Sequence, residues 1–110
     1  METRQVGCSG LRVSRLGLGT MTWGRDTPAE NAHALLEMFC AAGGTLIDTA
    51  AAYGAGDAER IVGRLVRELG NRDEVVIATK AGFVILTDRC GGCRATTSTY
   101  GRSTPGAMPR

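Results

Sequence analysis

Three polar residues of this 110-residue chain have side chains that together suit proton transfer: Asp48, Tyr53 and Lys80. Lys80 is distinctive, because every other Lys or Arg position in the chain holds an arginine. An ammonium beside a tyrosine stabilises the phenolate form of that tyrosine, and a carboxylate beside the lysine keeps the lysine protonated. Such a trio has the chemistry to protonate a carbonyl oxygen while a hydride arrives at the carbonyl carbon.

These residues meet only if secondary structure brings them to one face. The apolar pattern predicts strands and helices that alternate along the chain, at residues 15–19, 28–42, 45–50, 57–69 and 75–79. The last of these segments is a continuous apolar run, which is typical of a strand buried on both faces. Because the carboxyl ends of parallel strands lie on one face, Asp48 and Lys80 are predicted to lie within about 4 Å of each other, with Tyr53 on the same face.

The helix predicted at 28–42 carries the clearest local signals. Thr27 is a suitable N-cap, Pro28 suits the first helical position, and Glu30 completes a capping box with Thr27. The residues at helical spacing that predict its buried face are Ala32, Leu35, Leu36, Phe39 and Cys40.

The order of the elements predicts an α/β fold. About 30 residues separate one central strand from the next, which suits right-handed crossovers between parallel strands. Two short extended pieces within residues 5–13 predict an additional hairpin. Periodicity alone leaves open a Rossmann sheet and a closed barrel. The barrel is favoured, because Glu59 stands where a glycine fingerprint starting at Gly54 and Gly56 requires its third glycine.

Several groups of residues, in order and at compatible spacing, resemble the early motifs of the aldo-keto reductases. They are residues 17–24, 47–54, 59–63 and 77–80. The resemblance implies an incomplete (β/α)8 TIM barrel with an N-terminal β-hairpin and roughly three βα units, formed by residues 1–83. Residues 84–110, rich in Thr, Ser, Gly, Arg and Pro, are predicted to be a disordered tail unrelated to the family.

The same resemblance implies an NADPH-dependent oxidoreductase that reduces a small-molecule aldehyde or ketone to an alcohol. It assigns catalytic roles to Asp48, Tyr53 and Lys80, with Tyr53 as the proton donor. No metal is implied. The positions that the resemblance places near the cofactor are Gly19, Thr20, Met21 and Asp48.

One member of the family's catalytic set has no counterpart. The family uses a histidine after the next barrel strand, whereas the only histidine here, His33, falls on the first predicted helix. A whole barrel takes about 250 residues, so the 110-residue chain alone is expected to be inactive. Two alternatives stay open: a truncated fragment with no activity or only an interaction role, and a lyase that forms a Schiff base on Lys80.

Composition narrows the classes of partner. The net charge is only +2 and the basic residues are scattered, so neither a nucleic acid nor an anionic membrane is an expected partner. There is no apolar run long enough to span a bilayer and no signal-peptide pattern, which favours a cytoplasmic protein with reduced cysteines. The apolar strand at 75–79 also predicts self-association through an exposed sheet edge.

Overall fold

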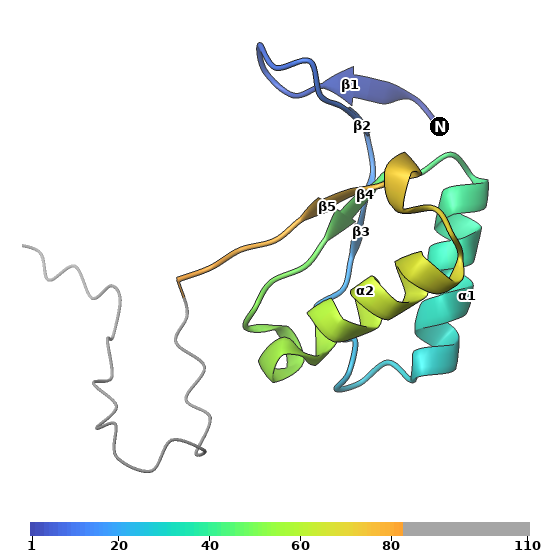
Figure 1. Ribbon diagram of the computed structural model, residues 1–110, viewed down its shortest axis with the longest axis vertical. Coiled ribbons are helices and arrows are strands. Elements are labelled where there is room, and N and C mark those ends of the chain that lie inside the picture. The colour runs from blue at the N-terminus through green and yellow to red at the C-terminus, as the bar shows by residue number, and fades with distance from the viewer. Residues whose placement is uncertain (83–110) are drawn as a thin grey trace, which may run out of the picture.

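A computed structural model of the chain describes residues 1–82. The predicted tail at 84–110 therefore lies outside the described residues. Figure 1 shows a hairpin at one end of the molecule, a small sheet in the middle and two helices packed beside it. The elements are β1 (Thr3–Gln5), β2 (Arg12–Ser14), β3 (Gly17–Gly19), α1 (Ala29–Ala41), β4 (Leu46–Asp48), a 3-10 turn (Tyr53–Gly56), α2 (Asp57–Glu68), a second 3-10 turn (Arg72–Glu74) and β5 (Val76–Ala78).

The central sheet is parallel and has the order β3-β4-β5. Its register aligns the last residues of the strands, since Gly19 pairs with Asp48 and Asp48 pairs with Ala78. The three strands thus end at one level. The strands and helices follow one another along the chain in the predicted order. Because the polar residues of interest occupy or closely follow these ends, the register brings them to one face of the sheet.

The hairpin predicted near the N-terminus is confirmed, with β1 and β2 paired antiparallel. Ser14 connects it to the central sheet. Its buried hydroxyl donates to the Leu16 carbonyl oxygen at 2.6 Å and accepts from the backbone N–H groups of Thr45, at 2.9 Å, and Leu46, at 3.2 Å. One side chain thereby satisfies main-chain groups at the start of both β3 and β4.

Helix α1 begins one residue later than predicted, and the predicted capping box is wrong. Pro28 is the N-cap, with φ −57° and ψ 149°, and its carbonyl oxygen accepts from the Ala32 N–H at 3.0 Å. No side chain among the residues that the structure describes caps the helix, and the Thr27 hydroxyl is hydrogen-bonded to the Thr22 hydroxyl at 2.7 Å instead. The Thr27 hydroxyl, which the local pattern assigned to the N-terminus of α1, therefore bonds within the preceding loop.

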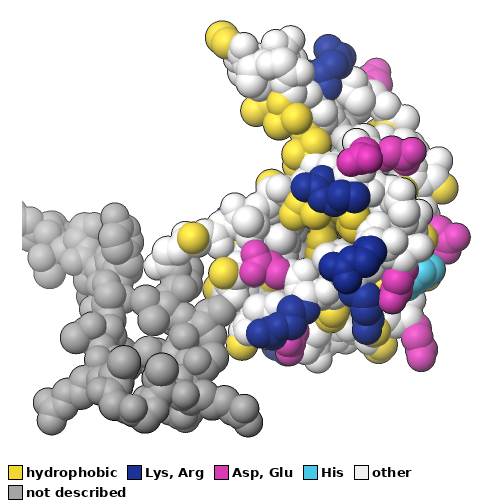
Figure 2. Space-filling model, viewed as in Figure 1, with side chains coloured by type: hydrophobic (Ala, Val, Ile, Leu, Met, Phe, Trp, Pro, Cys, Tyr) yellow, Lys and Arg dark blue, Asp and Glu magenta, His cyan; other side chains and the backbone are white. Residues whose placement is uncertain are grey.

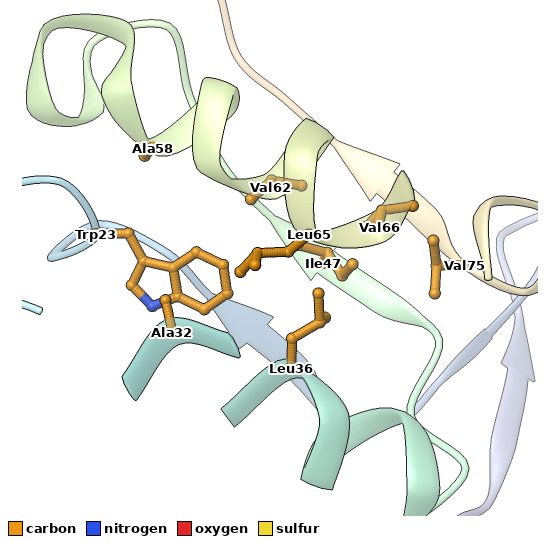
Figure 3. Packing of buried hydrophobic residues seen from close by; sticks show 9 residues of the cluster. All are labelled: Trp23, Ala32, Leu36, Ile47, Ala58, Val62, Leu65, Val66 and Val75. Atoms are coloured by element: carbon orange, nitrogen blue, oxygen red, sulfur yellow. The ribbon is translucent and has the colours of Figure 1, made fainter. Parts of the chain in front are cut away.

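The core lies between the two helices and the sheet. In Figure 3 the side chains of α1 and α2 point toward each other, with Trp23 and the β4 residue Ile47 between them. The buried cluster consists of Trp23, Ala32, Leu36, Ile47, Ala58, Val62, Leu65, Val66 and Val75. The apolar stripe of α2 is buried as its spacing predicts. On α1 the buried face is narrower than predicted, since Leu35 is exposed.

Strand β5 differs from its prediction in burial. A strand covered on both faces was expected, yet all three residues of β5 are only half-buried. The reason is its position at the edge of the described sheet, where β4 is its one hydrogen-bonded neighbour within residues 1–82.

The surface over α2 carries charges of both signs. Figure 2 shows Lys or Arg side chains intermixed with Asp and Glu side chains over the helices rather than a patch of one sign. On α2, ion pairs join Arg60 with Asp57 and Arg64 with Glu68. Within residues 1–82, neither helix is both long enough and apolar enough to cross a membrane.

Candidate active site

The carboxyl ends of β4 and β5 bring Asp48, Tyr53 and Lys80 together. Lys80 Nζ donates to Asp48 Oδ1 at 2.6 Å and lies 3.4 Å from the Tyr53 hydroxyl oxygen. The ammonium also sits 5.1 Å from the centroid of the Tyr53 ring. The predicted approach of Lys80 to Asp48 is confirmed by this distance. The Lys80 ammonium thus contacts both a carboxylate and a phenol. Asp48 and Tyr53 lie at and after the end of β4, whereas Lys80 follows β5.

A further contact of Lys80 could not be read from residue types. Lys80 Nζ donates to the carbonyl oxygen of Thr49 at 3.0 Å. All three protons of the ammonium therefore have an acceptor in Asp48, Thr49 or Tyr53. Because any residue supplies a main-chain carbonyl, no sequence signal identifies this one.

The electrostatics of the site favour the charged form of the lysine. The hydrogen bond to Asp48 raises the pKa of the Lys80 ammonium above its ordinary value, and the contact with Tyr53 adds to the rise, while desolvation opposes it. The side chains remain accessible, with 52% of Lys80 and 41% of Asp48 exposed. A molecule arriving from solvent can reach the pair directly.

Asp48→Asn is expected to lower the pH at which Lys80 loses its proton. Because the pKa of Lys80 is raised, the pair makes its full contribution to stability when the pH is below the ordinary pKa of a lysine. This contribution disappears as the pH rises through the pKa of Lys80. The measurement is an NMR titration of chain labelled with 15N-lysine, in which Lys80 is the one labelled side chain. Titration of Asp48→Asn at the wild-type midpoint or above it would contradict this account.

The loop after β4 is shaped so that Tyr53 turns back over the strand ends. Backbone N–H groups of Thr49 and Ala51 donate to the carbonyl oxygens of Ala78, at 2.8 Å, and Lys80, at 3.2 Å. These bonds hold the loop alongside the chain that leaves β5. Gly54 then adopts a left-handed conformation with φ 56°, where an added Cβ would lie 3.0 Å from the Trp23 carbonyl oxygen. Glycine is favoured there by its conformation, and the close approach leaves little room for a side chain.

The residues predicted near a cofactor, Gly19, Thr20 and Met21, lie at the end of β3 beside Asp48. Gly19 is exposed and would have open space around an added Cβ, and Met21 exposes 58% of its surface. Thr20 is fully buried instead, and its hydroxyl and its backbone N–H both donate to the Asp48 carbonyl oxygen at 3.0 Å. The Thr20 side chain therefore holds the backbone of Asp48 in place.

Comparison with known proteins identifies the family of the chain. Residues 15–103 match the Aldo/keto reductase family. The chain belongs to the aldo/keto reductase family. Among curated relatives, aldo-keto reductase YhdN of Bacillus subtilis is 43% identical over 91 residues, which cover 76% of this chain and 26% of the relative. Norsolorinic acid reductase stcV of Emericella nidulans is 47% identical over 79 residues, covering 66% of this chain and 20% of its own length.

Solved structures place the fold within the same family. The holo form of aldo-keto reductase AKR11C1 from Bacillus halodurans superposes with a TM-score of 0.66 at 36% identity, over 74% of this chain and 26% of that one. Residues 1–82 therefore form part of a TIM barrel with an N-terminal hairpin, as predicted, and not part of a Rossmann sheet. The chain spans 20–26% of the length of the curated aldo-keto reductases that it matches.

Proposed function

We propose that this chain supplies the Asp, Tyr and Lys of an NADPH-dependent aldo-keto reductase that reduces a small aldehyde or ketone to an alcohol. Family membership supports an oxidoreductase. The observation that carries the finer proposal is the Lys80 ammonium, which contacts the Asp48 carboxylate at 2.6 Å and the Tyr53 hydroxyl at 3.4 Å on an accessible strand-end face.

Each side chain has a separate task in the proposed reaction. The Tyr53 hydroxyl gives its proton to the carbonyl oxygen of the substrate. The Lys80 ammonium stabilises the phenolate that remains on Tyr53, and the Asp48 carboxylate keeps Lys80 protonated. The Thr49 carbonyl oxygen orients the ammonium from one further side.

The face around these residues suits a nicotinamide. Met21 offers an exposed apolar side chain and Gly19 leaves open surface at the end of β3, next to the strand that ends in Asp48. NADPH, when bound, supplies the hydride. Gly19 and Met21 would border it directly, while Thr20 would contribute by fixing Asp48.

The geometry gives less support to the Schiff-base lyase. A nucleophilic lysine must lose its proton near neutral pH, which requires a lowered pKa. The contact with Asp48 instead raises the pKa of Lys80. Borohydride trapping of a carbonyl compound on Lys80 would favour the lyase over the reductase.

The proposal is tested by completing the barrel. We expect a chimaera that carries residues 1–82 in place of the matching segment of B. subtilis YhdN to oxidise NADPH in the presence of para-nitrobenzaldehyde. The 110-residue chain alone is expected to show no such turnover, because hydride transfer requires the cofactor to be fixed against the substrate. A folded chimaera without activity would refute the reductase, and turnover by the chain alone would refute its expected inactivity.

We also propose that the isolated chain self-associates through its sheet. Both β3 and β5 lie at edges of the described sheet, and the β5 residues are half-buried. Unpaired main-chain groups on such an edge are a template for a strand of a second copy. Size-exclusion chromatography across a dilution series is expected to show concentration-dependent oligomers, and a monodisperse monomer at every concentration would contradict this.

A further inference from the structure

Lys80 lies two residues beyond the end of β5, so contacts outside that strand contribute to the direction of its side chain. The strand ends at Ala78, and the bonds from the Thr49 and Ala51 N–H groups reach the carbonyl oxygens of Ala78 and Lys80. These bonds fix the backbone along one side. They act on the carbonyl groups of Ala78 and Lys80, whereas the direction of the Lys80 side chain also depends on how the intervening Thr79 is held.

A side-chain contact with helix α2 holds Thr79. The Thr79 hydroxyl donates to Glu59 Oε1 at 2.6 Å. This length is typical of a hydroxyl bonded to a charged carboxylate, which is about twice as strong as a bond between neutral groups. Successive side chains of an extended segment point to opposite faces, so a bond that draws Thr79 toward α2 turns Lys80 toward Asp48.

Glu59 is well suited to serve as the anchor. Glu59 lies in the first turn of α2. The nearby α2 residues Ala58 and Val62 are buried in the core, which holds this part of the helix in place. A glutamate at this helical position often reaches back to cap its own helix, but no side chain of the described part of the molecule caps α2. Within residues 1–82, no ion pair involves the Glu59 carboxylate either. The carboxylate is therefore directed at Thr79 rather than at its own helix.

We propose that Glu59 is a positioning residue, which acts through the Thr79 hydroxyl to aim the Lys80 ammonium at Asp48 and Tyr53. Calling it a positioning residue for catalysis rests on the proposed reductase function. The geometric part does not, because the direction of Lys80 is measurable without any turnover.

The first test uses the full chain labelled with 15N-lysine, at a concentration where it is monomeric. Thr79→Val removes the hydroxyl with little change of shape or charge, and we expect Lys80 to titrate at a lower pH, closer to ordinary lysine. Thr79→Ser keeps the hydroxyl and is expected to retain the wild-type midpoint. Amide spectra check that each variant is folded. An unchanged midpoint in Thr79→Val, or an equal fall in both variants, would overturn the proposal.

Two variants of Glu59 distinguish its positioning role from the direct effect of its negative charge on Lys80. Glu59→Gln and Glu59→Ala both remove the negative charge, but glutamine keeps an oxygen that accepts from Thr79. We expect the Lys80 midpoint of Glu59→Gln to lie nearer to wild type than that of Glu59→Ala. Equal midpoints would assign the effect to charge alone and overturn the positioning role. Acetic anhydride labelling of Lys80 at a series of pH values gives the same comparison at concentrations too low for NMR.

Activity of the chimaera then tests the link to catalysis. Thr79→Val is expected to lower kcat while KM for the aldehyde changes little, and Thr79→Ser is expected to restore kcat. If the titrations shift as expected but the parent chimaera is inactive, the reductase proposal fails while the Glu59 contact stands. If the parent chimaera is active and the titrations do not respond, the positioning role fails instead.

Discussion

Tyr53→Phe in the YhdN chimaera is expected to lower kcat for para-nitrobenzaldehyde by about 10²–10⁴-fold, which is the usual contribution of a positioned general acid. The phenyl ring keeps the shape of the side chain but has no proton to give. The Lys80 ammonium would lose one of its three contacts and keep those to Asp48 and Thr49. KM for NADPH is expected to change little, because the hydroxyl acts on the carbonyl substrate.

The matched control is a charged residue remote from the strand ends. Arg67 lies in the last turn of α2 and is exposed, so Arg67→Gln is expected to leave kcat within a factor of two or so, as surface substitutions generally do. Stopped-flow and steady-state loss of NADPH absorbance measure both variants. A Tyr53→Phe chimaera with the kcat of its parent would remove Tyr53 from the role of proton donor.

Trp23→Ala is expected to lower the free energy of unfolding of the chimaera by about 3–5 kcal/mol, the range found when a large buried side chain is truncated. Trp23 is 1% exposed and is the largest fully buried side chain of the described residues. It packs in the cluster that joins α1, α2 and β4 (Figure 3). Its removal also leaves a cavity in the cluster against which Tyr53 packs.

Met38 provides the control for this measurement. It lies on α1 with 70% of its surface exposed, so Met38→Ala is expected to change the free energy of unfolding by less than about 0.5 kcal/mol. Urea unfolding followed by far-UV circular dichroism gives both values without relying on tryptophan fluorescence. Equal stability losses for Trp23→Ala and Met38→Ala would show that the Trp23 cluster does not hold the fold together.

Secondary structure was predictable because its signals are local. The helical spacing of apolar residues in α2 and the short apolar run of β5 lie within single segments, and the structure confirms both elements. The capping box at Thr27 failed despite an equally local signal. The conformation of the loop between Thr22 and Thr27 brings their hydroxyls together, so the Thr27 side chain bonds to Thr22 and not to the helix N-terminus.

The placement of the site was predictable from topology, since parallel strands that end together bring Asp48 and Lys80 to one face. The supporting contacts were not. The Glu59 carboxylate and the Thr79 hydroxyl are separated by 20 residues, and the Thr49 carbonyl and Lys80 by 31. Neither pair is indicated by spacing or composition. The first forms because the fold brings Glu59 of α2 to Thr79, and the second because β4 and β5 end side by side.

By itself, the sequence determined the α/β order, the family resemblance and the three residues proposed for proton transfer, because periodic apolar residues and motif types are properties of the chain. Only the tertiary structure decided how that chemistry is held in place. It assigned the Thr20 side chain to the Asp48 backbone, and it directed Glu59 toward Thr79 rather than toward its own helix end. Hydrogen bonds between distant segments form according to which groups packing brings within reach, and that distance exists only in the folded molecule.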